Sequence, residues 1–112
     1  MMDIRYENKF KKDYKRAASQ GLNTKLLYNI INIIAAGQKL PEKYRDHKLN
    51  DDRQYKNCRE CHINPDWLLV YRINRSQLVL ECVRLGSHSE LFGEYELEDY
   101  YESVNDNELV WL

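Results

Sequence analysis

The spacing of apolar residues predicts two helices in the first third of the chain. After a short opening strand over residues 3–7, apolar residues recur at helical spacing over 8–18 and form a broad stripe over 24–36. Gly21 and Gly37 end the two helices, because glycine readily adopts the left-handed conformation found there. The apolar positions are Phe10, Tyr14 and Ala17, then Leu26, Leu27, Ile30, Ile31, Ile33 and Ile34. We expect both helices to pack on a sheet.

Three strand candidates follow over residues 55–63, 67–73 and 77–85, separated by Asn-Pro-Asp and Asn-Arg-Ser turns that suit hairpins. The second and third candidates are apolar on both faces, which is typical of the buried middle of an antiparallel sheet. Residues 41–53, before them, have the composition of a loop. The predicted fold class is therefore α+β: a small antiparallel sheet with two N-terminal helices packed on it, in the order βααβββ.

A change of composition after Gly93 divides the chain. Residues 1–93 have the length and composition of one compact domain. Residues 94–112 hold seven acidic residues and no Lys or Arg, so we expect an acidic C-terminal extension. One hypothesis is that this extension folds back over a basic surface as a shield. The other is a solubilising, partly ordered segment, since runs of charge are usually solvated.

The net charge of −1 conceals a strong asymmetry along the sequence. Residues 1–75 carry a charge of +7 and residues 76–112 a charge of −8, and a basic body is typical of proteins that bind polyanions. The chain has no apolar run of the roughly 18 residues that a membrane span needs, and its start lacks the apolar core of a signal peptide. We therefore expect a cytoplasmic protein with no membrane partner.

Cys58, Cys61 and Cys82 form an odd set without a secretory signal, which favours reduced thiols. The Cys-x-x-Cys-His stretch has a zinc-knuckle spacing at one end, yet the chain offers no second ligand pair at similar spacing. In a strand, Cys58 and Cys61 also point to opposite faces. We therefore interpret all three cysteines as small buried hydrophobes and expect neither a metal nor another cofactor.

Three histidines and a carboxylate lie near the predicted strand ends. If the strands pair as sequential hairpins, His62, Asp66 and His88 meet at one end of the sheet, and the loop with His47 reaches the same rim. Imidazole titrates near neutrality, so one ring can accept a proton from an RNA 2′-OH while another donates to the leaving 5′-oxygen. This group of residues indicates acid-base chemistry on a phosphodiester.

Three motifs in these regions resemble the RelE-type toxins of bacterial toxin-antitoxin systems, within the RelE/ParE superfamily, and in particular the YafQ branch. They are YRDHKL at 44–49, RECHINPDWLLVYRI at 59–73 and RLGSHSELFG at 84–93. The resemblance covers about residues 1–93. It implies a small endoribonuclease that enters the ribosomal A site, cleaves the translated mRNA without a metal and is neutralised by a cognate antitoxin. Such a toxin reaches operator DNA only through its antitoxin.

The resemblance also implies roles for particular residues. The catalytic group is His47, His62, Asp66 and His88, with His88 as the first choice for proton transfer. Phe92 is expected to stack on or orient an mRNA base. The charge pattern, rather than the resemblance, suggests Lys56, Arg59 and Arg84 as basic side chains that bind the substrate, with a solvated face as the alternative. One departure concerns Glu60, since YafQ-type sequences have an aspartate there, and the sequence assigns Glu60 no role.

Two alternatives share this fold. The first is a ParE-like toxin that blocks a topoisomerase without cutting RNA, although that branch lacks this arrangement of histidines. The second is a non-catalytic corepressor that only binds its antitoxin on operator DNA. The sequence does not specify the codon preference, the antitoxin or the oligomeric state.

Overall fold

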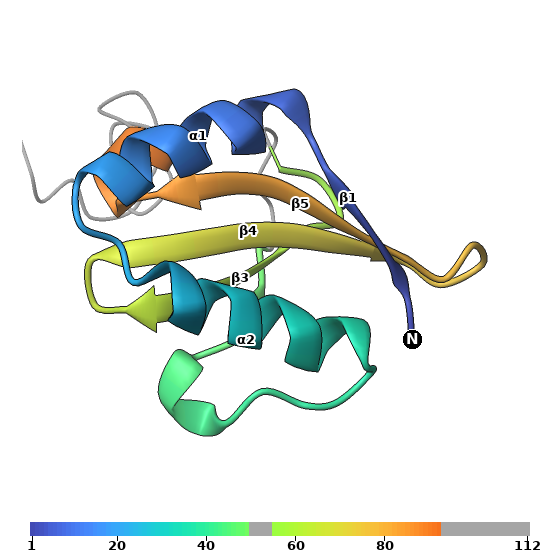
Figure 1. Ribbon diagram of the computed structural model, residues 1–112. Coiled ribbons are helices and arrows are strands. Elements are labelled where there is room, and N and C mark those ends of the chain that lie inside the picture. Colours follow the sequence, from blue (N-terminus) through green and yellow to red (C-terminus); the bar gives the residue numbers. More distant parts are fainter. Residues whose placement is uncertain (50–54, 93–112) are drawn as a thin grey trace, which may run out of the picture.

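The computed structural model describes residues 1–49 and 55–92 of the chain (Figure 1). The elements in order are β1 (Asp3–Tyr6), α1 (Asn8–Ser19), α2 (Thr24–Ala35), the 3-10 helix η1 (Glu42–Tyr44), β2 (His47–Lys48), β3 (Arg59–Asn64), β4 (Trp67–Asn74) and β5 (Val79–Gly86). Residues 88–92 form one further helical turn. The predicted α+β class is confirmed, and β2 is a strand that the sequence pattern did not predict. The acidic extension lies outside the described residues.

The sheet has five strands in the order β1-β5-β4-β3-β2. Strands β3, β4 and β5 pair as antiparallel neighbours, as the hairpin turns predict, and β2 adds an antiparallel strand beside β3. Strand β1 pairs with β5 in parallel, so the sheet is mixed rather than purely antiparallel. Because β5 lies between β1 and β4, it joins the first residues of the chain to the hairpins.

Both helices pack on one face of the sheet and form the larger hydrophobic core (Figure 1). Asn23 caps α2 by accepting a hydrogen bond from the Leu26 N–H at 3.0 Å. Gly21 and Gly37, both with positive φ, follow the two helices as predicted. Each helix has 12 residues, and within the described ranges no helix is long and apolar enough to cross a membrane.

The opposite face of the sheet carries a second, smaller core. It contains Tyr55, Cys58, Leu68, Val70, Val83, Leu91 and Phe92. Cys58 therefore lies on the face opposite Cys61, which belongs to the helix-side core, as expected for these two thiols. Residues 55–58 and the helical turn 88–92 supply the cover here in place of a long helix. The functional side chains lie on this less covered face.

A buried carboxylate fastens α1 to the end of β5. Asp13 is 2% exposed and accepts two hydrogen bonds from Arg84, at 2.6 and 3.1 Å, and one from the Leu85 N–H at 2.9 Å. The register between β4 and β5 shifts at Val83, which leaves one extra residue in β5. Such a bulge can redirect a side chain, and here Arg84 points toward α1. Arg16 donates a further bond to Asp13 at 3.1 Å.

Candidate active site

His47, Glu60 and His62 form the centre of the candidate site. His47 in β2 lies directly opposite Glu60 in β3, and His62 follows two positions later on the same face of the strand. The Nε2 atom of His47 lies 3.2 Å from Oε2 of Glu60, and that of His62 lies 3.9 Å from the same oxygen. The two imidazole centroids are 6.4 Å apart. One carboxylate therefore stands between two imidazoles.

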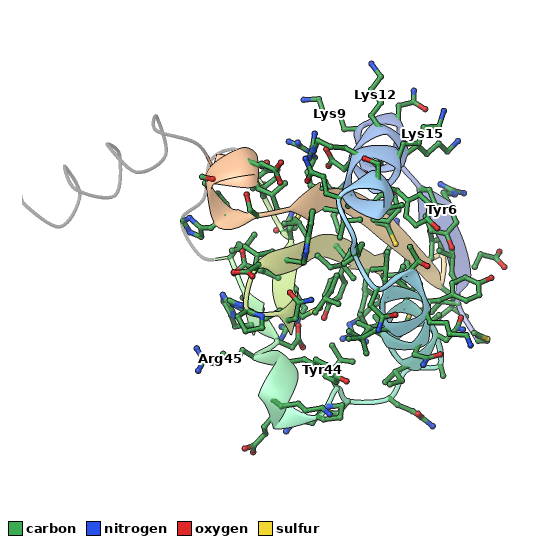
Figure 2. All side chains as sticks on the ribbon, turned by 60° about the vertical axis from the view of Figure 1, so that its left-hand side comes forward. Tyr6, Lys9, Lys12, Lys15, Tyr44 and Arg45 are labelled. Carbon is green, nitrogen blue, oxygen red and sulfur yellow. The ribbon has the colours of Figure 1, made fainter. Side chains whose placement is uncertain are left out.

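The backbone before β2 fixes the ring of His47. Its Nδ1 atom lies 2.7 Å from the carbonyl oxygen of Arg45, which can only accept a hydrogen bond. Arg45 has a φ of 49°, in the left-handed region, and its side chain points away from the protein (Figure 2). The N–H at Nδ1 thus donates to this carbonyl, which leaves Nε2 facing Glu60. The ring is oriented from both sides.

A three-residue network holds β2 against β3. Asp46 accepts hydrogen bonds from Arg59, at 3.0 Å from Nη2 and 3.2 Å from Nε, and from the hydroxyl of Tyr71. The bond to Asp46 raises the pKa of Arg59, while burial, followed by the bond to Asp46, raises the pKa of Tyr71. Arg59 was expected to bind substrate, and the structure shows it engaged in holding the strand that carries His47.

The environment of His62 favours its neutral form. Partial burial lowers the pKa of His62 below its usual 6.5, and the nearby positive groups His47, Arg45 and His88 lower it further. Glu60 acts in the opposite direction, but its oxygen is beyond hydrogen-bonding distance and burial dominates. A neutral imidazole can accept a proton, so His62 is suited to act as a base near pH 7.

His88 and Phe92 reach the site on the helical turn after β5. Ser87 and Glu90 form a reciprocal cap: Ser87 Oγ accepts from the Glu90 N–H at 3.2 Å, and Glu90 Oε1 accepts from the Ser87 N–H at 2.8 Å. The rings of His88 and Phe92 are 4.8 Å apart. His88 is exposed, whereas Phe92 is only 6% exposed and packs edge-on against Tyr55. Phe92 therefore supports the ring of His88 in this structure.

The structure does not bring every predicted residue into contact with the histidines. Asp66 is exposed in the β3–β4 turn, where Asn64 Oδ1 accepts from its N–H at 3.1 Å, and in the described part of the chain no hydrogen bond or ion pair joins its carboxylate to an imidazole. Lys56 is exposed on the turn before β3. Arg84 is engaged with Asp13 and, at 3.2 Å, with the hydroxyl of Tyr55. Among the described residues, no hydrogen bond or ion pair therefore joins the side chains of these three residues to an imidazole.

Glu60 is the functional candidate that sequence reasoning left without a role. It is only 5% exposed although it is charged, and charged residues are rarely buried without a purpose or a partner. One signal for it was available: strand alternation places Glu60 and His62 on the same face. Its pairing with His47 depends on β2, whose two residues are too few to show any periodicity.

The three cysteines are buried thiols, as expected. Burial raises the pKa of Cys82 to about 12 and raises that of Cys61 as well, so both stay protonated at neutral pH. In the described ranges, no group of three or more His, Cys, Asp or Glu side chains is placed to hold a metal ion.

The fold and the site together define a class: small α+β proteins that carry a group of imidazole and carboxylate side chains on the open face of a sheet. The family model for the bacterial toxin of type II toxin-antitoxin system, YafQ, matches residues 2–93. The chain belongs to this YafQ toxin family. The mRNA interferase toxin YafQ of Escherichia coli strain K12 is 36% identical over 92 residues, which cover 81% of this chain and 96% of that protein.

Solved structures agree with this assignment. The metal-bound toxin from Helicobacter pylori is 47% identical, with a TM-score of 0.77 over 82% of this chain and 100% of that chain. The Escherichia coli DinJ–YafQ complex contains a chain that is 33% identical, with a TM-score of 0.72 over 83% of this chain and 100% of that chain.

Proposed function

We propose that this protein is an mRNA endoribonuclease toxin that acts on translating ribosomes, cleaves mRNA in the A site and stops translation. The observation that carries the proposal is the group of His47, Glu60 and His62, with His88 near enough to lower the pKa of His62. The relatives named mRNA interferase toxin YafQ support the same activity.

The proposed reaction is an in-line attack of an RNA 2′-OH on the adjacent phosphorus. His62, neutral near pH 7, accepts the 2′-OH proton, the P–O5′ bond breaks, and His88 donates a proton to the leaving 5′-oxygen. The products are a 2′,3′-cyclic phosphate and a 5′-OH. His47 keeps its Nδ1 bond to the Arg45 carbonyl, and its Nε2 atom exchanges Glu60 for the phosphate, to which it donates a hydrogen bond. Asp66, in the neighbouring β3–β4 turn, assists the acid-base exchange.

The partners follow from the same proposal. A relative is known in the DinJ–YafQ complex, described as a toxin-antitoxin complex, and we propose a cognate antitoxin for this chain as well. Lys56 and the other basic side chains near the site would meet mRNA or ribosomal RNA, and operator DNA would be reached only through the antitoxin. The site of action is the cytoplasm, where translating ribosomes are found.

The test is to map mRNA ends on translating ribosomes with the wild-type chain, His62→Ala and His88→Ala. Each variant is expected to lose about 10²–10⁴-fold in cleavage rate, the usual contribution of one general acid or base. Ser76→Ala, in the β4–β5 turn, is the matched control and should cleave normally. A wild-type chain that arrests growth without producing A-site cuts would contradict the proposal and favour the topoisomerase-blocking alternative.

The chemistry has its own check. Since the attacking oxygen belongs to the RNA, cleavage should continue in the presence of EDTA at magnesium levels that keep ribosomes intact. Loss of cleavage that is restored by zinc or copper would exclude the mechanism written above. Growth arrest that is lost on His88→Ala at unchanged antitoxin affinity would argue against the corepressor alternative.

A further inference from the structure

An apolar groove of about 610 Å³ lies between α1 and α2 and is bordered by Tyr6 at the end of β1. It is lined by Tyr6, Phe10, Lys11, Tyr14, Lys15, Thr24, Lys25, Leu27, Tyr28 and Ile31. The groove therefore belongs to the helical layer and is separate from the histidine site, which lies on the opposite face of the sheet.

The groove exposes aromatic surface that the fold itself does not cover. Tyr6 is 37% exposed, Tyr14 is 39% exposed and Tyr28 is 61% exposed. Tyr14 was expected to be part of the core of α1, but the buried stripe of that helix is Phe10, Asp13 and Ala17. Contiguous exposed aromatic surface of this kind marks an interaction site.

The charged residues of the groove are all basic. Lys11, Lys15 and Lys25 are its only charged lining residues, and Lys11 and Lys15 are spaced four apart along α1. Residues spaced by four lie on one side of a helix. The groove therefore fits an occupant with an apolar strip beside a row of carboxylates.

Residues 94–112 of this chain have that composition. Leu97, Tyr100, Tyr101 and Val104 fall at the i, i+3, i+4 and i+7 positions that an amphipathic helix uses to fill a groove. The acidic residues Glu94, Glu98 and Glu102 repeat every four positions, the same interval as the two lysines of α1. The segment contains no Lys or Arg that would repel the groove.

The chain can reach the groove from where the described part ends. Glu90 lies 3.2 Å from Arg16 on α1, so the polypeptide passes beside this helix just before residue 92. Residues 93–96 span up to about 13 Å when extended. A helix with its side chains is about 10–12 Å wide, so these four residues are long enough to cross α1. Since the relatives match this chain only through residue 93, the segment is additional to the family domain.

We propose that residues 94–112 dock in the groove between α1 and α2 of their own chain. Leu97, Tyr101 and Val104 enter between the exposed tyrosines, and Glu98 and Glu102 pair with Lys15 and Lys11. The docked segment covers aromatic surface that is otherwise open to water and neutralises the lysines at its rim.

The first test uses amide NMR signals of the full chain. The variant Leu97→Ser/Tyr101→Ser should shift the signals of groove residues, above all Tyr28, and leave those of β3 unchanged. The matched control is Leu109→Ser/Val110→Ser, which changes the same segment outside the proposed anchors and should leave Tyr28 in place. Shifts confined to the substituted segment, or an effect of the control as large as that of the anchors, would overturn the proposal.

Charge reversal provides a second, independent test. Lys11→Glu/Lys15→Glu should move the Tyr28 signal to its undocked position, and adding Glu98→Lys/Glu102→Lys in the same chain should restore it. Lys39→Glu, an exposed change outside the groove, is the control and should have no effect. If the combined variant does not restore the Tyr28 signal, the proposed pairing of glutamates with lysines is wrong. A Tyr28 position that varies with tenfold dilution would indicate docking between two copies and would also overturn docking within one chain.

Discussion

At the residue scale, the histidines differ in what holds each ring. His47 lies between a backbone carbonyl and Glu60, whereas His62 is partly buried near Arg45, His47 and His88. The two rings are 6.4 Å apart. The surroundings of His62 lower its pKa and so favour the neutral form that a general base needs.

Replacement of Glu60 tests its role in positioning His47. Glu60→Gln keeps the shape of the side chain but removes its charge, so His47 loses a charged partner on Nε2. We expect kcat/KM for ribosomal mRNA cleavage to fall about tenfold or more, which corresponds to about 1.4 kcal/mol, with an altered pH profile. Glu60→Asp, which restores the carboxylate found in the family, should recover much of the activity. Equal activity of Glu60→Gln and wild type across pH would show that the carboxylate only fills space.

The pH dependence of cleavage follows from the lowered pKa of His62. A base must be neutral to accept a proton, and His62 becomes protonated only below its usual 6.5 because burial and positive neighbours disfavour the charged ring. Cleavage should therefore fall only as pH drops below 6.5, where His62 becomes protonated. Above pH 6.5, protonation of His62 should no longer limit the cleavage rate. Single-turnover cleavage rates between pH 5 and 8 measure this. An acidic limb centred above pH 6.5 would argue against His62 as the base.

The buried Asp13 is expected to be a major contributor to stability. Asp13→Ala leaves Arg84 and the Leu85 N–H without their acceptor, and breaking a buried ion pair in this way costs about 3–5 kcal/mol. Because Arg84 is partly exposed, the lower end of that range applies. Urea denaturation measures the loss, and Asp3→Ala, an exposed control, should change the free energy of unfolding by less than about 0.5 kcal/mol. A loss below about 1 kcal/mol for Asp13→Ala would show that water replaces the carboxylate.

At the element scale, the helical turn 88–92 connects the site to the rest of the fold. Its reciprocal cap joins Ser87 to Glu90, and Glu90 also forms an ion pair with Arg16 at 3.2 Å. Gly86, immediately before it, leaves little room: an added Cβ would lie 3.0 Å from Glu90 Oε1 and 3.2 Å from Leu91 Cδ2. The position of His88 is thus set by contacts with α1 and β5.

Removing the cap should affect catalysis more than global stability. Ser87→Ala deletes one side of the cap, which typically costs about 1 kcal/mol, and the loss falls on the turn that carries His88. We expect a clear fall in kcat for mRNA cleavage with a small shift in Tm. Ser76→Ala makes the same change at the opposite end of the sheet and should leave kcat unchanged. If Ser87→Ala has wild-type kcat, the turn does not need its cap to hold His88.

Most elements that the sequence predicted are long enough to show a period. Both helices and the three long strands carry repeated apolar positions, and all five are present together with the short opening strand, β1. Strand β2 has two residues and therefore no pattern, yet it places His47 beside Glu60. The parallel pairing of β1 with β5 joins Asp3 to Val79, and local sequence contains no information about a partner so far along the chain.

The candidate site was predictable in part for the same reason. The motifs indicated His47, His62 and His88, and the structure brings these rings into one region. The sequence pattern assigns Asp13 no role because its neighbours are mostly lysines. Its spacing from Phe10 and Ala17 nevertheless placed it on the buried stripe of α1. The contacts that orient His47 depend on pairing between segments and are visible only in three dimensions.

At the scale of the whole molecule, charge is distributed unevenly over the surface. Lys9, Lys12 and Lys15 point outward along the outer side of α1 (Figure 2), while the only carboxylate of that helix, Asp13, is buried. A basic ridge without acidic neighbours on its helix suits contact with the phosphates of ribosomal RNA.

Salt dependence distinguishes an RNA-contacting ridge from a solvated one. If Lys9 and Lys12 each neutralise a phosphate, Lys9→Ser/Lys12→Ser should weaken ribosome binding and reduce the slope of log affinity against log salt by about 0.7–0.9 per lost contact. Binding measured between 50 and 200 mM salt, which is roughly the range where such effects are large, provides the slope. Lys39→Ser is the control. An unchanged slope in the double variant would show that the ridge is solvated and does not contact phosphates.

The position of β5 between β1 and β4 has a consequence for the synthesis of this toxin. In the described sheet β5 is the last strand in the sequence, yet it pairs with the first, and His88 follows it. A nascent polypeptide that is still short of this point has neither a complete sheet nor its third imidazole. If the proposed function holds, the chain cannot cleave the message of its own ribosome before residues 79–92 have been synthesised.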